Sequence, residues 1–270
     1  MKLTRLAVVA SLVAVFALAG CSKSDNAGGT ITYGVDATYA PNEFKDDKGH
    51  PVGWEVELGN AIAEKLGKTA VFKIAVFDAI IPGVTGGKYD AGLSSFTDNA
   101  EREKVVDFVN YYQAGIQWAT KIGNKSALAV DPNNACGLTI AVQNGTYEVD
   151  DLKAKSKACT DAGKAPIQQL GFDDQSMATQ AAVSGRAAAV TADSPIVQYA
   201  VKQNSGTLEL IGTPYESAPY GIAVAKDNSD LAKSIQKALQ DLQADGTYAS
   251  ILDKWGVTAG AVNSVTINGK

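Results

Sequence analysis

Segments with strand character alternate with segments of helical character along most of this chain, and this alternation limits the possible folds more than any other feature. The strand-like segments are short apolar runs, whereas the helical ones carry apolar residues three or four positions apart. Alternating β and α units predict a mainly parallel sheet covered by helices, an α/β fold. Ligands bind such sheets beyond the carboxyl ends of the strands, so the loops there are where function is expected.

The pattern predicts individual elements as well. The expected strands are Thr30–Val35, Val71–Val76, Asp90–Leu93, Ile116–Lys121, Leu138–Val142, Ala187–Thr191 and Tyr220–Ala225. The expected helices are one with Trp54, Leu58, Ala61, Ile62 and Leu66 on one face before Gly67, one capped by Asp78 and running to Val84, Met177–Val183 before Gly185, one capped by Ser229 that carries Leu231, Ile235, Leu239 and Leu242, and a last one with Tyr248, Ile251, Leu252 and Trp255 before Gly256.

The N-terminus has the features of an export signal. Lys2 and Arg5 precede an apolar run over residues 6–19, which is too short to span a membrane comfortably. The run ends in Leu18-Ala19-Gly20-Cys21, which resembles the bacterial lipobox, whose cysteine receives a lipid. An ordinary secretory signal or a short membrane anchor remains the alternative. The lipobox interpretation predicts a lipoprotein signal peptide over 1–20 and an extracytoplasmic protein anchored to the cell membrane through Cys21, with a flexible tether over 21–29.

Composition excludes some functions and suggests a disulfide. The 270-residue chain has a formal net charge of −5, which argues against nucleic acid as a partner. Beyond Cys21 the cysteines are Cys136 and Cys159, and a pair in an exported protein predicts a disulfide, with two free buried thiols as the alternative. The single histidine, His50, lies in a polar turn, and the cysteines lack ligand spacing, so no metal site is expected.

Two loops carry groups suited to an anion and a flat apolar group. Asp36 follows the first expected strand, and Tyr39 offers a ring with a polar tip. The alternative is that Asp36 merely closes a turn and that Tyr39 belongs to the core. The loop that begins at Ser94 offers hydroxyls, backbone N–H groups near an expected helix start, and the guanidinium of Arg102. An arginine can hold a carboxylate through two parallel hydrogen bonds, but a solvated Arg102 is the plainer alternative.

Two further loops follow strands in the second half of the chain. Gln143-Asn-Gly145-Thr146 offers backbone donors near a probable helix start, and Gly145 lets a ligand approach closely. Asp193 could hold an ammonium group, or it could simply cap the helix that follows. Together the loops offer an anion-binding group in Arg102, a cation-binding group in Asp193 and a flat ring in Tyr39, a combination that suits a free amino acid. No loop pairs a nucleophile with a base, so no enzyme and no cofactor is expected.

Several segments, in this order and spacing, resemble the family 3 extracellular solute-binding proteins, the amino-acid receptors of ABC importers. The resemblance runs from about Thr30 to Val257. It rests on Gly34–Pro41, Gly53–Leu58, Phe77–Val84, Gly87–Asp90, Ser94–Arg102, Val106–Tyr112, Val142–Thr146, Gly185–Asp193 and Ala244–Gly256.

The resemblance implies a two-lobed periplasmic-binding-protein (Venus-flytrap) fold joined by two hinge strands. Lobe one would hold residues 30–112 and 218–258, and lobe two residues 115–216. The crossings would fall near 112–115 and 216–220, and residues 259–270 would form a C-terminal tail. The expected disulfide would then lie within lobe two and would not lock the hinge.

The resemblance also assigns ligand contacts. Arg102 would bind the α-carboxylate with help from Ser94, Ser95 and Thr97, and Thr146 would add a contact from lobe two. Asp193 would bind the α-ammonium. The ligand side chain would lie between Tyr39 and Phe77, and its far end would meet Asp36 and Gln143.

The implied partners are a free amino acid and the permease subunits of an ABC importer, and the protein would act as a monomer. A carboxylate at Asp36 disfavours an acidic side chain, so a neutral amide or a basic amino acid is expected. Asn42 departs from the phenylalanine that many relatives carry there, and Ala188 from an aspartate. A sensory module and a dehydratase on the same fold are the rival functions, since fold does not fix function.

Overall fold

The computed structural model describes residues 28–124, 126, 128 and 131–269, so the predicted signal peptide and Cys21 lie outside it. The strands are β1 (Thr30–Val35), β2 (Thr38–Tyr39), β3 (Glu43–Lys45), β4 (Pro51–Val52), β5 (Thr69–Ile74), β6 (Ala91–Gly92), β7 (Val106–Lys121), β8 (Thr139–Gln143), β9 (Gln168–Phe172), β10 (Ala189–Asp193) and β11 (Leu208–Ala225). The α-helices are α1 (Trp54–Lys65), α2 (Ile80–Thr85), α3 (Tyr147–Asp161), α4 (Gln175–Ser184), α5 (Ser194–Gln203), α6 (Ser229–Ala244) and α7 (Thr247–Trp255). Short 3₁₀ turns are η1 (Phe77–Ala79), η2 (Arg102–Lys104), η4 (Pro132–Asn134) and η5 (Thr258–Gly260).

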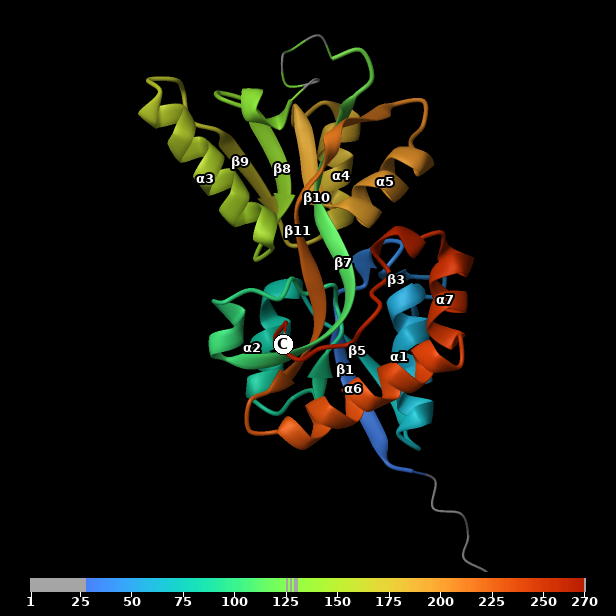
Figure 1. Ribbon diagram of the computed structural model, residues 1–270. Helices are drawn as coiled ribbons and strands as arrows, with labels where there is room; N and C mark the ends of the chain where they lie inside the picture. Colours follow the sequence, from blue (N-terminus) through green and yellow to red (C-terminus); the bar gives the residue numbers. More distant parts are fainter. Residues whose placement is uncertain (1–27, 125, 127, 129–130, 270) are drawn as a thin grey trace, which may run out of the picture.

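The molecule has two lobes, each a sheet covered by helices (Figure 1). One lobe contains β1, β5 and β6 with α1, α2, α6 and α7; the other contains β8, β9 and β10 with α3, α4 and α5. The strands β7 and β11 run through both, so a single eight-stranded sheet has the order β5-β1-β6-β11-β7-β10-β8-β9. The expected α/β two-lobed class is confirmed, while the exact boundaries at 112–115 and 216–220 stay a prediction.

The sheet is mixed, whereas the alternation of elements predicted a mainly parallel one. The pairs β1–β5, β1–β6, β8–β9 and β8–β10 are parallel. The long strands pair antiparallel with each other, β6 pairs antiparallel with β11, and β10 with β7. The difference arises because β11 brings the chain back from lobe two in the direction opposite to β7.

The ribbon formed by β7 and β11 is irregular where it passes between the lobes. Its register shifts between Ile211 and Tyr215, between Tyr215 and Ala218, and between Tyr220 and Gly221. Such irregularities bend a strand and break its regular ladder. The predicted hinge crossings coincide with this stretch.

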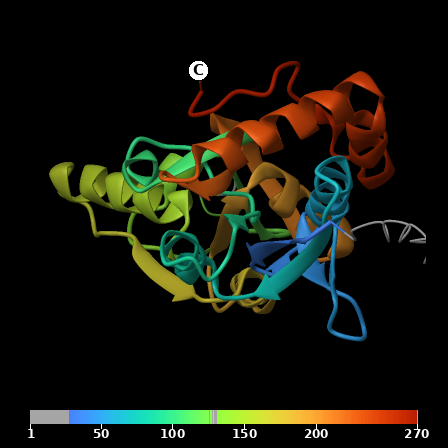
Figure 2. The same cartoon turned by 90° about the horizontal axis from the view of Figure 1, so that it is seen from below.

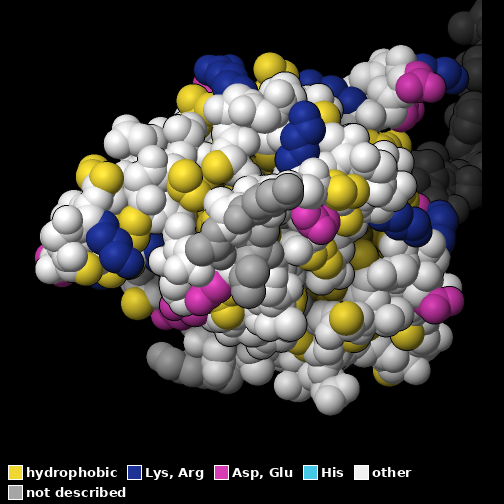
Figure 3. All heavy atoms as spheres, turned by 90° about the horizontal axis from the view of Figure 1, so that it is seen from above, with side chains coloured by type: hydrophobic (Ala, Val, Ile, Leu, Met, Phe, Trp, Pro, Cys, Tyr) yellow, Lys and Arg dark blue, Asp and Glu magenta, His cyan; other side chains and the backbone are white. Residues whose placement is uncertain are grey.

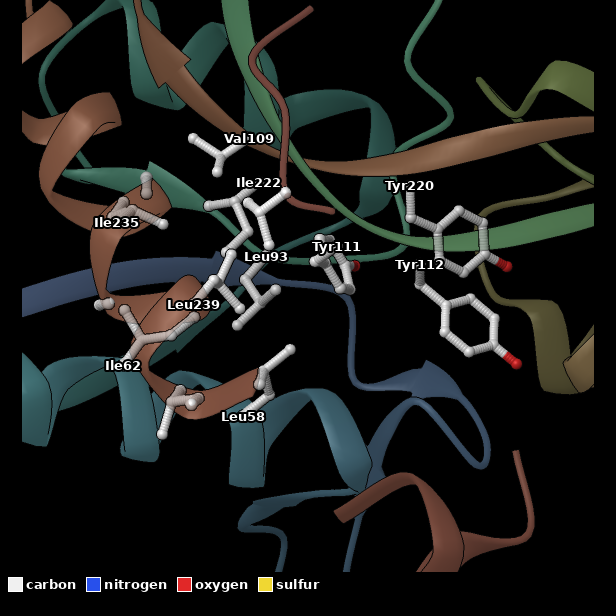
Figure 4. Close-up of a cluster of buried hydrophobic side chains, with 14 of the residues drawn as sticks. Leu58, Ile62, Leu93, Val109, Tyr111, Tyr112, Tyr220, Ile222, Ile235 and Leu239 are labelled. Atoms are coloured by element: carbon white, nitrogen blue, oxygen red, sulfur yellow. The ribbon is translucent and has the colours of Figure 1, made fainter. Parts of the chain in front are cut away.

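Lobe one is held by a large apolar core (Figure 4). Leu58 and Ile62 of α1 face Leu93, which directly follows β6, and Ile222 of β11. Leu239 of α6 closes the cluster, and all five side chains are essentially inaccessible to solvent. Full burial of such a side chain stabilises the fold by roughly 1.5–3 kcal/mol, so the helical face predicted from apolar spacing accounts for how α1 packs.

Residues 259–269 do not hang free as a tail. Val109 forms an antiparallel bridge with Ile267, and Tyr112 forms one with Ala261. Val265 is buried in the lobe-one core. This C-terminal segment therefore lies along β7 and beside α6 as part of lobe one (Figure 2).

Some local predictions were wrong at their ends. The strand expected at Val71–Val76 begins at Thr69, and the one expected at Ala187–Thr191 runs to Asp193. The strand expected at Asp90–Leu93 contains only Ala91 and Gly92 in the sheet. The ends of edge strands and short strands are determined by the neighbouring strand with which they pair, and an apolar run in the sequence does not reveal that neighbour.

Two predicted helix caps were also wrong. Asp78 lies inside a 3₁₀ turn, and α2 begins only at Ile80. Ser229 is the first residue of α6, and Asn228 occupies the cap position. The residues after Asp36 were expected to form one loop, but they form a small antiparallel sheet of β2, β3 and β4. These strands are two or three residues long and are bounded by turn residues, so no alternating pattern marks them in the sequence.

The predicted disulfide is present. The Cys136 and Cys159 sulfur atoms are bonded, with the Cα atoms 5.5 Å apart. The bond joins the segment after η4 to α3, inside the lobe that contains β8–β10. Seen from above, the outer face of the molecule mixes acidic, basic and hydrophobic side chains, in keeping with the small net charge (Figure 3).

Candidate functional site

Strand ends from both lobes meet at the junction between them. Asp36 follows β1 and Ser94 lies just beyond β6, whereas Gln143 ends β8 and Asp193 ends β10. All four side chains are buried. The rule that ligands bind beyond the carboxyl ends of strands therefore points to this junction from both sides.

Asp36 is bound by lobe two. The Gln143 side-chain amide donates a hydrogen bond to Asp36 Oδ2 and another to the Asp173 carbonyl at 3.0 Å. The Asp36 backbone N–H donates to Ser94 Oγ at 2.9 Å. Burial raises the pKa of Asp36 to about 6, and the hydrogen bond from Gln143 only partly offsets it. A cation reaching this carboxylate would be stabilised, because the charged form is poorly compensated.

Tyr39 and Asp193 form a second contact across the junction. The Tyr39 hydroxyl donates to Asp193 Oδ2 at 2.7 Å, and the Asp193 backbone N–H donates back to that hydroxyl at 3.3 Å. Burial raises the pKa of Asp193 to about 6. Asp193 occupies the cap position of α5, yet its side chain makes no capping bond to the described backbone. The interpretation of Asp193 as a mere cap is therefore not supported.

Arg102 lies against two aromatic rings rather than free in solvent. Its Nη1 donates to the Thr97 carbonyl at 2.8 Å, and its Nη2 donates across the junction to the Gly145 carbonyl at 3.1 Å. Its Cζ is 5.4 Å from the ring centroid of Phe77 and 5.6 Å from that of Phe96. These contacts orient the guanidinium, which is the arrangement needed to hold a carboxylate bidentately.

The helix-start argument for this loop was wrong in part. Arg102 begins η2, a three-residue 3₁₀ turn, so the loop lacks the dipole of an α-helix. The second helix start is present, since α3 begins at Tyr147 directly after Thr146. The Thr146 hydroxyl donates to the Gln143 carbonyl at 2.9 Å, which fixes that turn.

Ser94 and Ser95 use their hydroxyls inside the protein. Ser94 Oγ donates to Glu43 Oε1 at 2.7 Å, and Ser95 Oγ donates to Glu55 Oε1 at 2.7 Å. Ser95 adopts a φ of 51°, a conformation uncommon for residues other than glycine. Its backbone N–H also donates to Glu55, at 3.1 Å. The buried glutamates therefore hold the loop in a conformation it would not adopt alone.

Asn42 belongs to the same network. Its side-chain amide donates to Ser95 Oγ at 2.7 Å, and its carbonyl oxygen accepts from the Trp54 indole N–H at 2.6 Å. Tyr111 adds a hydrogen bond to Glu55 at 2.5 Å. Asn42, which stands where many relatives carry phenylalanine, therefore supports the Ser95 loop, because both its amide nitrogen and its amide oxygen already bond to protein groups.

Sequence reasoning missed several of these residues. Glu43 and Glu55 are fully buried, and burial, followed by repulsion from Glu55, holds the pKa of Glu43 well above its ordinary value. Phe96 stacks on Phe77 with ring centroids 4.7 Å apart. Glu148, in the first turn of α3, is also buried. Phe96 lies within the segment Ser94–Arg102 that carries the family resemblance, whereas no sequence pattern distinguishes the three glutamates from surface acids.

The structure brings all the predicted contact residues to one junction. These are Asp36, Tyr39, Phe77, Ser94, Ser95, Thr97, Arg102, Gln143, Thr146 and Asp193, and every one except the half-buried Arg102 is buried. The junction presents one guanidinium, carboxylates on both sides and aromatic faces. Its donor set does not resemble a metal centre, and in the described part of the chain no three His, Cys, Asp or Glu side chains gather as ligands.

The sequence profile of the bacterial extracellular solute-binding proteins, family 3, matches residues 31–258. The chain belongs to this family. It is 38% identical over 241 residues to the arginine-binding protein ArgT of Corynebacterium glutamicum, covering 89% of this chain and 78% of ArgT. It is 30% identical to the glutamine-binding protein GlnH of Bacillus subtilis, covering 94% of this chain and 97% of GlnH.

A solved structure supports the same relationship. An ancestral arginine-binding protein bound to arginine superposes with a TM-score of 0.78 at 38% identity, covering 85% of this chain and 99% of that protein. The family match extends over nearly all of both lobes, so the resemblance predicted from the sequence motifs is confirmed. The C-terminal segment that lies along β7 falls beyond the matched range.

Proposed function

We propose that this family 3 solute-binding protein is an extracytoplasmic receptor that binds a polar amino acid and delivers it to an ABC importer. Within the predicted class of neutral amide and basic ligands, basic amino acids with arginine first fit the site best. One observation carries this choice: buried Asp36 and buried Asp193 approach the junction from opposite lobes, and the guanidinium of Arg102 lies at the same junction. Such a set complements a ligand with two cationic ends and one carboxylate.

Charge balance gives the physical reason. Burying a carboxylate without a cationic partner is costly, and the raised pKa of both aspartates shows that neither is well compensated within the protein. A basic amino acid would bring one positive group to Asp193 and another to Asp36, while Arg102 would donate hydrogen bonds to its α-carboxylate. A neutral amide would leave Asp36 compensated only by hydrogen bonds, such as the one from Gln143.

Contacts across the junction supply a closing mechanism. Tyr39–Asp193, Gln143–Asp36 and Arg102–Gly145 each join the two lobes. A ligand that touches both lobes gains its full set of contacts only when they are close together, so it shifts the population toward the closed form. A micromolar affinity requires about −8 kcal/mol, which a few charge-assisted contacts and ring burial can supply.

Location and partners follow from the predicted lipobox at Cys21 and from the family. We propose a lipid-anchored monomer that presents its ligand to the permease subunits. Among the described residues the structure contains no helix long and apolar enough to span a bilayer. Processing at Cys21 is tested by mass spectrometry of the mature protein from its membrane fraction.

The dehydratase alternative fits the site less well. Its substrates are anionic carboxylic acids related to prephenate, and the carboxylates of Asp36 and Asp193 would repel them. Incubation of the protein with such acids, followed by product analysis, is expected to show no turnover. A sensory role stays the remaining alternative, and stimulation of amino-acid uptake by the reconstituted importer distinguishes the two.

Calorimetry with the twenty amino acids tests the ligand class. Arginine or lysine is expected to bind most tightly, and Asp36→Asn is expected to weaken arginine at least tenfold while leaving glutamine within threefold. Asp46→Asn, which removes a carboxylate that pairs with His50 at 3.4 Å in an outer turn, is the matched control. Tight binding of glutamate with no response to arginine, lysine or glutamine would refute the proposal.

A further inference from the structure

Glu148 is a buried acid that the predicted ligand contacts leave without a role. It lies in the first turn of α3, two residues after Thr146, and only 1% of its surface is exposed. Its Oε1 has no hydrogen-bond partner among the residues that the structure describes. A buried, unpaired acidic oxygen is costly unless it is protonated or meets a ligand.

The groups around Glu148 are those of the candidate site. Asp193 at the end of β10 repels its charge, and Arg102 on η2 attracts it. Its charge in turn acts on the hydroxyls of Tyr39 on β2 and Tyr215 on β11. Glu148 therefore lies within electrostatic reach of both Arg102 and Asp193, and it follows closely after the turn whose Gly145 carbonyl accepts a hydrogen bond from Arg102.

The balance of these effects favours the neutral acid. Burial is the largest influence and, with repulsion from Asp193, raises the pKa of Glu148 to about 8. The backbone at the start of α3, the nearby Thr146 side chain and the attraction of Arg102 lower the pKa, but their combined effect is smaller than that of burial and repulsion. Near neutral pH the group is then mostly a carboxylic acid, which can donate a hydrogen bond.

Charge counting on the liganded site leads to the same form. A basic amino acid places its two cations against Asp36 and Asp193 and its carboxylate against Arg102, so the charges of these three ion pairs already cancel. An additional ionised carboxylate would leave buried negative charge, whereas a neutral acid adds a donor for the carboxylate without changing the balance.

We propose that Glu148 acts as a neutral carboxylic acid that donates a hydrogen bond to the α-carboxylate of the bound amino acid beside Arg102. This inference rests on the proposed function and makes Glu148 a specificity residue for zwitterions that carry a carboxylate. It also makes binding sensitive to alkaline pH, since the donor is lost when Glu148 ionises.

The test compares the dissociation constant for arginine at pH 6, 7, 8 and 9 in the wild type and Glu148→Gln, whose amide remains a donor throughout. Between pH 7 and 9 the wild type is expected to lose about tenfold more affinity than Glu148→Gln. Asp150→Asn is the matched control, because Asp150 is an exposed acid in the same turn, paired with Lys153 at 2.9 Å. It is expected to follow the wild type.

Three outcomes overturn the inference. Parallel pH profiles in the wild type and Glu148→Gln would show that Glu148 does not carry the proton. Tighter wild-type binding at pH 9 than at pH 7 would show that the ionised form holds the ammonium instead. Failure of the wild type to bind any amino acid would overturn the proposed function as well, which separates that failure from the other two.

Discussion

Replacement of Arg102 by alanine tests the centre of the proposed site. The guanidinium donates one hydrogen bond to the Thr97 carbonyl and one to the Gly145 carbonyl, and its remaining N–H groups are available to a ligand carboxylate. Removing one partner of a buried, hydrogen-bonded charge pair costs about 2–5 kcal/mol. At about 1.4 kcal/mol per decade, affinity for arginine is expected to fall roughly 30- to 4,000-fold.

The assay needs a control for the loss of an arginine that lies over an aromatic ring. Arg186 provides it, since its Cζ lies 5.5 Å from the ring centroid of Phe172 and the residue is exposed. Calorimetry is expected to give Arg186→Ala an affinity within threefold of the wild type. Urea unfolding of both variants establishes that each is folded at the temperature of the measurement.

Arg102→Lys refines the same prediction. A lysine keeps the charge but has no planar fork, so it is expected to recover only part of the affinity lost in Arg102→Ala. An affinity for Arg102→Ala within threefold of the wild type, in a folded protein, would refute the assigned carboxylate contact and the reasoning built on it.

Three further predictions concern stability. Replacing Cys136 and Cys159 by serine opens a loop with a sequence separation of 23 and is expected to cost about 3 kcal/mol in urea unfolding, with ligand affinity unchanged; a tenfold weaker affinity would contradict an effect confined to one lobe. Asn42→Ala leaves the Trp54 indole N–H without its acceptor and is expected to cost about 1–3 kcal/mol, so a variant as stable as the wild type would remove the support role given to Asn42. Because Asp193 has its pKa raised to about 6 from 3.8, the folded state binds this proton more tightly than the unfolded state, and stability of the ligand-free protein is expected to fall by up to about 3 kcal/mol as pH rises from about 4 to 6. Asp193→Asn is expected to flatten that slope in chemical unfolding at a series of pH values, and an unchanged slope would contradict the assignment.

Much of the fold could be predicted because its signals are local. The face of α1, the end of α4 at Gly185 and the end of α7 at Gly256 each depend on residues within one or two turns, and both glycines adopt a left-handed φ. The disulfide followed from cysteine count and compartment. The direction of β11 could not be read in this way, because pairing between distant strands leaves no periodic mark in either of them.

The candidate site was predicted in its contacts but not in its support. Arg102, Asp193 and Asp36 lie at strand ends or in a loop, which are the places where ligand-binding polar residues are expected in an α/β fold. From the sequence, Glu43 and Glu55 look like ordinary exposed acids beside apolar residues. In the structure both are buried and accept hydrogen bonds from the hydroxyls of Ser94 and Ser95. Burial of an acid is decided by tertiary packing, so the sequence carries no direct signal of it.

The irregular ribbon of β7 and β11 has a mechanical consequence. Two strands bonded side by side yield readily when they curve out of their common plane but resist sliding within it, because sliding breaks every rung of the ladder. The register shifts between Ile211 and Gly221 place the weakest rungs between the lobes. We expect this ribbon to confine relative motion of the lobes to bending, so that residues from opposite lobes would return to the same alignment on closure.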